Sequence, residues 1–138
     1  MDFERVVVHV RRADYATLEL TRRGWTQPSL QYFERAISYF TECLERVQFV
    51  VLSDDISWCQ VHLSAPEMVF ASEHPAAVDL AIASMCDHAI ITIGSFGWWA
   101  AWLADGVTIT NKEFPRPHSL LTRRMRREDY YKTDWIAL

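Results

Sequence analysis

Residues 88–106 read HAIITIGSFGWWAAWLADG, in which an apolar run, a turn of small residues and a longer apolar run follow one another. The first run, residues 88–93, is rich in isoleucine and predicts a buried β-strand. The second, residues 96–104, has the length of a helix, and Asp105 and Gly106 are expected to end it, with Gly106 as the C-cap. A strand that leads directly into a helix is the building unit of α/β proteins.

The same alternation runs through the rest of the chain. Residues 6–10 (VVVHV) predict the first strand, and Pro28 and Ser29 open a helix whose apolar residues recur every three or four positions up to Val47. The helix predicted at residues 76–86 is apolar almost all round, which favours burial. Further strands are predicted at 49–52, 68–70 and 107–110, a further helix at 56–63, and a tail from residue 115 that wraps the surface. This order predicts an α/β, Rossmann-like parallel sheet with helices on both faces.

Length and composition limit the classes of protein to which the chain can belong. Its 138 residues predict a single domain, and 50% hydrophobic with 23% charged residues is ordinary for a globular protein. A net charge of −4 argues against nucleic acid as a partner, because a coating role needs a basic surface. The three cysteines form no CxxC pair, which excludes a zinc ribbon, and each is expected to be a small buried apolar group. No apolar run approaches the roughly 20 residues of a membrane span.

Polar residues cluster where three of the predicted strands end. Ligands of open parallel sheets bind beyond the carboxyl ends of the strands, so these residues are candidates for a site. They are His9, Arg11, Arg12 and Asp14 at the first strand, Ser53, Asp54 and Asp55 at the second, and Gly94, Ser95 and Phe96 at the fourth.

The turn after the fourth strand has the composition of an anion-binding loop. At a helix start, free backbone N–H groups and the positive end of the helix dipole face a ligand. Gly94 lets the backbone approach closely, and Ser95 adds a hydroxyl donor. The turn is neither a Walker loop nor a GxGxxG motif. The alternative is a plain helix start with Ser95 as N-cap, and the turn alone does not decide between the two.

The two arginines after the first strand favour a diphosphate ligand. A guanidinium forms paired, charge-assisted hydrogen bonds with phosphate oxygens. Side chains alternate along a strand, so Arg11 shares a face with His9, whereas Arg12 points to the other face and is expected to pair with Asp14 or Asp54. The alternative is a surface patch of salt bridges.

The acidic candidates are open to two interpretations each. Ser53 or Asp54 is expected to cap the helix at 56–63, while Asp54 and Asp55 support the arginines; a metal site is disfavoured, because only one acidic pair is visible. Asp79 lies in an apolar stretch and therefore needs a partner. It either interacts with the dipole of its own helix or accepts the N1–H and N2–H₂ groups of a guanine base.

Three further sets of residues have more ordinary interpretations. Trp98, Trp99 and Trp102 stand at helical spacing and are expected to pack their helix onto the sheet. The basic segment 122–129 (TRRMRRED) is typical of a solvated helix face. No chemistry is assigned to the scattered histidines His62, His74, His88 and His118.

Three motifs in order resemble those of the galactoside α-1,2-L-fucosyltransferase family. VHVRRADY (8–15) resembles the family's HxRRxDY motif, and LSDDISWC (52–59) resembles its FSDDxxWC segment. DLAIASMCDHAIITIGSFGWWAAWLADG (79–106) resembles the long signature that follows. The tail resembles the end of the animal members, so the resemblance covers nearly the whole chain.

The resemblance implies the C-terminal, donor-binding half of a GT-B glycosyltransferase. Its members move L-fucose from GDP-fucose, with inversion and without a metal, to the 2-hydroxyl of a terminal β-galactoside. The implied partners are therefore GDP-fucose and a galactose-terminated glycan, and the implied location is the lumen of the Golgi, held to the membrane by an N-terminal anchor. Residues 1–138 are then expected to be one donor domain of a longer protein that also has the anchor, a stem and an acceptor half.

The resemblance also suggests roles for individual residues. His9 and Arg11 are expected to surround the guanine and the diphosphate, Asp79 to read the guanine, and Ser95 to contact phosphate. Asp54 and Asp55 match acidic positions with supporting roles. Arg11 is expected to stabilise the departing GDP, and Asp14 is the best local carboxylate for a general base.

Three alternatives to this function remain open from the sequence. The chain is a non-catalytic module that binds a guanine nucleotide, a fucosyltransferase of different linkage (α-1,6 or peptide O-linked), or an α/β scaffold whose arginines make only salt bridges. Binding of GDP compared with ADP separates the scaffold from the others, and analysis of the product linkage separates the enzymes.

Overall fold

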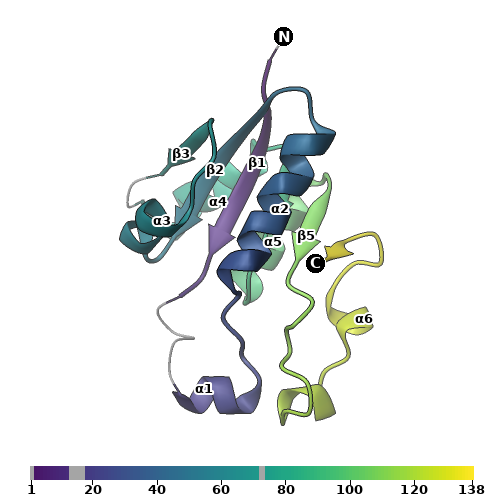
Figure 1. Ribbon diagram of the computed structural model, residues 1–138. Coiled ribbons are helices and arrows are strands. Elements are labelled where there is room, and N and C mark those ends of the chain that lie inside the picture. The colour runs from purple at the N-terminus through teal and green to yellow at the C-terminus, as the bar shows by residue number, and fades with distance from the viewer. Residues whose placement is uncertain (1, 13–17, 72–73) are drawn as a thin grey trace.

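The computed structural model describes residues 2–12, 18–71 and 74–138. These residues form a six-stranded sheet in the order β3-β2-β1-β4-β5-β6, and every neighbouring pair in it is parallel (Figure 1). The strands are β1 (Glu4–Val10), β2 (Val47–Ser53), β3 (Met68–Phe70), β4 (His88–Ile90), β5 (Thr108–Thr110) and β6 (Ile136–Ala137). This is the strand order of the doubly wound dinucleotide-binding folds. The prediction of a Rossmann-like α/β fold is therefore confirmed.

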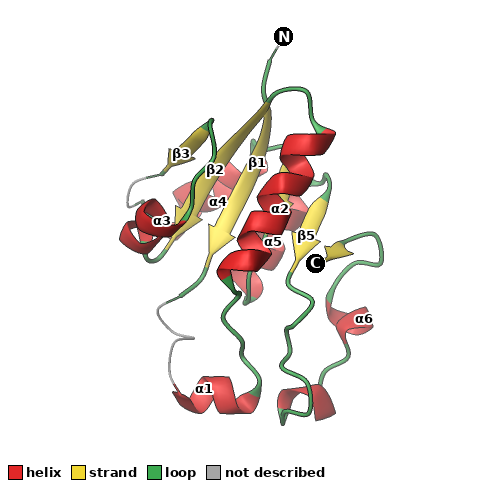
Figure 2. Ribbon diagram, viewed as in Figure 1, coloured by secondary structure: helices red, strands yellow, loops and turns green. Residues whose placement is uncertain are grey.

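Helices cover both faces of the sheet. In Figures 1 and 2, α2 and α3 lie in front of the strands, whereas α4 and α5 lie behind them. The helices in chain order are α1 (Leu18–Arg23), α2 (Leu30–Cys43), α3 (Ile56–His62), α4 (Ala76–Ser84), α5 (Ser95–Ala104), the 3-10 helix η2 (Leu121–Arg123) and α6 (Arg127–Tyr130).

Alternation along β1 divides the core into two layers. Val6, Val8 and Val10 pack with α2 and α3 in one cluster, and Val7 packs with α4, α5 and the C-terminal segment in the other. All four valines are at most 1% exposed. A strand covered on both faces must be apolar at successive positions, which explains the unbroken VVV run.

Helix α2 begins where the sequence predicts and ends earlier. The Ser29 side chain accepts a hydrogen bond from the backbone N–H of Tyr32 and caps the helix. The prediction that the helix continues to Val47 is wrong, because Leu44 is extended and Val47 belongs to β2, where it pairs with Glu4. Pairing with β1 supplies the backbone hydrogen bonds that a longer helix would have supplied.

Two burial predictions for the second helical layer are corrected: α4 is mostly exposed, and of the three tryptophans of α5 only Trp98 packs, partly buried, against the core. Helix α4 buries only Ala83, and Val78 is 42% exposed. On α5, Ala100 and Ala101 face the core, while Trp99 is 52% and Trp102 46% exposed. Small residues let the helix lie close to the sheet, so the indoles are turned outward or toward the C-terminal segment.

The end of α5 differs from the prediction in one residue. Asp105, not Gly106, adopts the left-handed conformation that caps the helix, with φ of 55°. Gly106 is required for a different reason, because a Cβ there would lie 1.7 Å from the backbone oxygen of Asp87. The glycine thus permits the close approach between the loop before β5 and the loop before β4.

The C-terminal segment is part of the core as well as the surface. β6 pairs with β5, and the side chains of Tyr131 and Trp135 are at most 9% exposed. Arg127 in the basic segment is half-buried, which corrects its assignment to a solvated face, although Arg123, Arg124 and Arg126 are exposed. Cys59 and Cys86 are buried as expected, whereas Cys43 is exposed at the end of α2.

Candidate functional site

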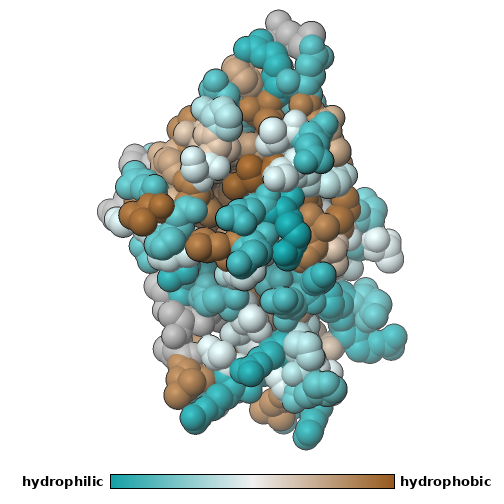
Figure 3. Space-filling model, viewed as in Figure 1, coloured by the Kyte–Doolittle hydropathy of each residue, from teal (hydrophilic) through white to brown (hydrophobic). Residues whose placement is uncertain are grey.

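The carboxyl ends of β1, β2 and β4 meet at one edge of the sheet. β1 lies between β2 and β4, and from β1 the chain builds the sheet in opposite directions on its two sides. Such a reversal of strand order leaves a crevice at the carboxyl edge, which is where doubly wound folds bind ligands. This edge points downward in Figure 1, and the surface in the lower part of Figure 3 is mostly hydrophilic.

Two adjoining cavities open at this edge. The larger, here called the main cavity, has a volume of about 290 Å³. The smaller, called the loop cavity, has a volume of about 140 Å³ and shares Arg11 and Phe96 with the first. The main cavity is lined by His9, Arg11, Ser53, Asp54, Ala71, His74, Ala76, Asp79 and Phe96, and the loop cavity by Arg11, Ile93, Gly94, Ser95 and Phe96.

His9 is a buried, neutral imidazole in the wall of the main cavity. The centres of the His9 and Phe96 rings lie 4.8 Å apart. The Nδ1 atom of His9 has no hydrogen-bond partner among the described residues. Burial lowers its pKa from 6.5 to about 4; the nearby Asp54 carboxylate opposes this, and the Arg11 guanidinium adds to it. Gly97 makes room for the ring, because a Cβ there would lie 3.1 Å from Nδ1.

The lowered pKa of His9 predicts how stability depends on pH. Between its unfolded pKa of 6.5 and its folded pKa of about 4, the unfolded chain binds a proton that the folded chain excludes. The free energy of unfolding is therefore expected to fall as the pH is lowered through this range, by about 3 kcal/mol from this group. Urea unfolding of the wild type and His9→Gln at pH 7 and pH 4 measures the difference.

The matched control for this prediction is His62→Gln. His62 lies on the exposed surface of α3. The control should keep the pH dependence of the wild type, and an equal dependence in His9→Gln would contradict the role of His9.

Arg11 is held at the mouth of both cavities. Its backbone N–H donates to Thr92 Oγ1 at 3.0 Å, and that hydroxyl donates to the backbone oxygen of His9 at 3.2 Å. Its guanidinium Nε lies 3.8 Å from the Asp54 carboxylate, and its side chain is 33% exposed. The backbone is thus fixed by the neighbouring strand segment, while the guanidinium remains accessible to an anion.

Arg12 faces away from both cavities. Its Nε lies 3.4 Å from Asp55 Oδ2, and its guanidinium lies 3.9 Å from the centre of the Trp58 ring on α3. Its backbone N–H donates to Asp54 Oδ1 at 2.9 Å. The Arg12 side chain therefore lines neither cavity, and of the two arginines Arg11 alone does so; the backbone of Arg12 contacts the site through its hydrogen bond to Asp54.

The two carboxylates after β2, Asp54 and Asp55, have different roles. Asp55 caps α3 by accepting a hydrogen bond from the backbone N–H of Trp58 at 3.2 Å. The prediction that Ser53 or Asp54 caps this helix is therefore wrong. The Ser53 hydroxyl instead donates to the backbone oxygen of Val10 and accepts the N–H of Asp55, which ties β2 to β1. Asp54 lines the main cavity, and Asp55 does not.

The turn before α5 lies in the loop cavity beside Arg11. Gly94 has φ of 96°, a conformation that L side chains rarely adopt, and it occupies the N-cap position without a side-chain cap. Ser95 is the first residue of the helix, so the alternative that Ser95 is a simple N-cap is wrong. The exposed start of a ten-residue helix therefore faces the same hollow as a guanidinium.

Asp79 and His74 form a pair at the far side of the main cavity. Asp79 is in the first turn of α4, and its Oδ1 lies 3.4 Å from His74 Nδ1, which leaves Oδ1 without a hydrogen bond of good geometry. Burial raises the pKa of Asp79, and His74 opposes this. Sequence reasoning missed His74, although it follows the third strand just as the other candidates follow theirs. That strand is only three residues long, so its sequence signal is weak and does not mark the residues after it as candidates.

Asp14, the remaining candidate, lies outside the described residues. Within residues 2–12, 18–71 and 74–138, no group of three or more His, Cys, Asp or Glu side chains is arranged to hold a metal ion. In the same ranges, no helix has both the length and the apolar character needed to cross a bilayer.

Comparison of the sequence with known proteins assigns the chain to a family. Residues 2–138 match the family model described as Glycosyl transferase family 11. The chain belongs to this family. The resemblance drawn from the sequence motifs is confirmed.

Relatives in the family carry fucosyltransferase names. The chain is 33% identical over 138 residues to galactoside alpha-(1,2)-fucosyltransferase 1 of Oryctolagus cuniculus, covering 96% of this chain and 37% of the relative. It is 33% identical to galactoside alpha-(1,2)-fucosyltransferase 2 of Sus scrofa, over 96% of this chain and 41% of that relative. The family 11 chain thus spans about two fifths of these relatives.

Proposed function

We propose that the chain binds GDP-fucose at the carboxyl edge of its sheet and provides this donor site to an enzyme that transfers L-fucose, with inversion, to the 2-hydroxyl of a terminal β-galactoside. The observation that carries the proposal is that Arg11 and the start of α5 line one hollow, adjoining the main cavity that contains Asp79. The names of the family 11 relatives support the sugar and the linkage. A location in the Golgi lumen and a GT-B partner half belong to the same proposal.

The loop cavity is suited to the diphosphate. The backbone N–H groups at the start of α5 and the positive end of its dipole attract an anion, and Arg11 adds a full positive charge with several donors. Asp54 lies close enough to orient the guanidinium. A phosphate bound here would exchange contacts with water for charge-assisted hydrogen bonds.

The main cavity is suited to the guanosine. Guanine presents N1–H and N2–H₂ side by side, and one ionised carboxylate accepts both. Asp79 lines the cavity with a carboxylate oxygen that lacks a hydrogen bond of good geometry, and the His9 and Phe96 rings supply apolar wall. A neutral His9 adds no second charge beside the cation Arg11.

Transfer by this site would depend on stabilising the departing GDP. Negative charge grows on the diphosphate as the bond to fucose breaks, so contacts from Arg11 and the N–H groups near Ser95 strengthen in the transition state. This charge stabilisation needs no metal ion. We retain Asp14 as the proposed general base for the galactose hydroxyl.

If Asp79 binds the guanine base, replacing it should reduce the preference of the chain for GDP over ADP. Asp79→Asn replaces one acceptor oxygen by a donor that faces the N–H groups of the base. We expect GDP affinity to fall by about 30-fold while ADP affinity changes little, because one of the two hydrogen bonds to the base is lost and the other is no longer made to a charged group. Calorimetric titration of the 138-residue chain with GDP and with ADP measures both.

Asp105→Asn is the matched control, because Asp105 is exposed at the far end of α5 and asparagine tolerates its left-handed backbone. The control should retain the preference for GDP. Equal binding of GDP and ADP by the wild type would overturn the proposed donor site and favour a scaffold role for the arginines.

A further inference from the structure

A third cavity adjoins the loop cavity and is not used by the contacts proposed for GDP. It has a volume of about 230 Å³ and is lined by Ser95, Trp98, Trp99, Asp129 and Tyr130. We call it the Trp cavity. Ser95 also lines the loop cavity, so the two hollows meet at the start of α5.

One wall of the Trp cavity is held rigidly by contacts between α5 and the C-terminal segment. The indole Nε1 of Trp98 donates to the backbone oxygen of Tyr130 at 2.7 Å. The Trp98 ring also stacks on Trp102, with centroids 5.4 Å apart and planes inclined by 11°, and lies 5.5 Å from the ring of the buried Trp135. A wall fixed in this way is preformed for a ligand.

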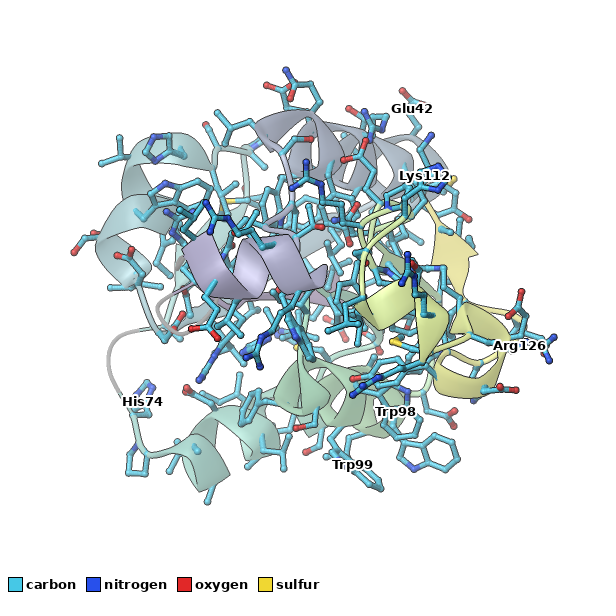
Figure 4. The ribbon with its side chains drawn as sticks, turned by 90° about the horizontal axis from the view of Figure 1, so that it is seen from below. Glu42, His74, Trp98, Trp99, Lys112 and Arg126 are labelled. Atoms are coloured by element: carbon cyan, nitrogen blue, oxygen red, sulfur yellow. The ribbon has the colours of Figure 1, made fainter. Side chains whose placement is uncertain are left out.

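The other wall is an indole that the fold leaves open. Trp99 is 52% exposed, and its ring meets Trp98 nearly at a right angle, at 78° with centroids 5.0 Å apart. Figure 4, seen toward the carboxyl edge, shows Trp99 directed outward from α5 and Trp98 on the side of the C-terminal segment, with His74 far to the other side. The exposed Asp129 carboxylate lies at the same cavity.

We infer that the Trp cavity binds a single pyranose ring of the transfer reaction, an inference that rests on the proposed function. A pyranose has an apolar C–H face that packs on an indole and hydroxyl groups that donate to a carboxylate, here Asp129. The cavity is smaller than the about 300–1,000 Å³ typical of drug-sized ligands, which favours one ring. Aromatic walls with few polar groups are the usual composition of such a site.

The order of the three cavities supports a sugar at this position. The main and loop cavities share Arg11 and Phe96, and the loop and Trp cavities share Ser95, so the loop cavity lies between the other two. A nucleotide sugar has the same order of base, diphosphate and sugar. The ring is either the fucosyl group of the donor or the galactosyl group of the acceptor, because both meet at the carbon next to the diphosphate.

Binding measurements on Trp99→Ala and Asp129→Asn test the inference and identify the ring. The 138-residue chain and each variant are titrated with GDP and with GDP-fucose, and saturation-transfer NMR follows methyl β-galactoside in the presence of GDP. If the ring is the fucosyl group, Trp99→Ala should lose about tenfold in affinity for GDP-fucose and none for GDP. If it is the galactosyl group, the galactoside signal should disappear while both nucleotides bind as before.

Leu103→Ala is the control, because Leu103 is also exposed on α5 but does not line the cavity. It should leave all three ligands unchanged. Normal GDP binding together with unchanged GDP-fucose and galactoside binding in both test variants would overturn the inference and leave the donor site standing. An equal loss in Leu103→Ala would also overturn it. Failure of the wild type to bind GDP would overturn the proposed function and this inference with it.

Discussion

Replacing Arg11 with alanine is expected to weaken GDP binding by about 100-fold, because loss of a charge-assisted contact to phosphate costs on the order of 2–4 kcal/mol. The expectation follows from the place of Arg11, which lines both the main and loop cavities. Arg11→Lys should recover only part of the affinity, since an ammonium lacks the planar pair of donors. Isothermal titration with GDP measures both variants.

Arg12 supplies a control of identical chemistry at the next position. Its side chain contacts Asp55 and Trp58 rather than either cavity. Arg12→Ala should therefore bind GDP nearly as well as the wild type, although it loses contacts with α3. Equal losses in the two variants would indicate a diffuse effect of positive charge instead of a defined diphosphate site.

Replacing Arg127 with alanine is expected to lower the free energy of unfolding by about 3 kcal/mol, because its removal takes a charged donor away from three buried oxygens. Its guanidinium donates to the backbone oxygens of Asn111 and Phe114 and to Thr110 Oγ1, and it lies 4.6 Å from the Tyr131 ring. Asn111, Phe114 and Thr110 are at most 2% exposed. Urea unfolding measures the loss.

Arg126→Ala is the neighbouring control for this prediction. The Arg126 side chain is 76% exposed, and its ion pair with Glu128 is 3.8 Å long. Such a pair at the surface contributes little, so the control should stay within about 0.5 kcal/mol of the wild type. A loss in Arg127→Ala no larger than this would show that water replaces the guanidinium at the three acceptors.

Local patterns predict most of the fold. The β-branched run at β1 and the strand, turn and helix around Gly94 give the parallel sheet and its functional edge, because period and turn chemistry are local properties. β6 escaped prediction because it has two residues and is defined only by its pairing with β5. The predicted end of α2 was too late, because the residues from Val47 onward form β2 and pair with β1 instead of continuing the helix.

The candidate site was predicted in part, for a similar reason. His9, Arg11, Asp54, Asp79 and Ser95 line the cavities, as their places at the end of a strand, just after one or at a helix start suggest. His74 was missed, since its position depends on a short strand at the edge of the sheet. The outward direction of Trp99 could not be predicted, because it depends on which face of α5 the sheet accepts.

The amino-acid sequence alone determined that a parallel sheet would gather arginine, carboxylates and a glycine turn at one edge, because alternation and strand direction follow from neighbouring residues. The tertiary structure decided which of two adjacent arginines enters the hollow, which histidine faces Asp79, and which indoles stay uncovered. Those outcomes depend on strand register and on contacts between segments far apart in the chain, and no short stretch of residues encodes them by itself.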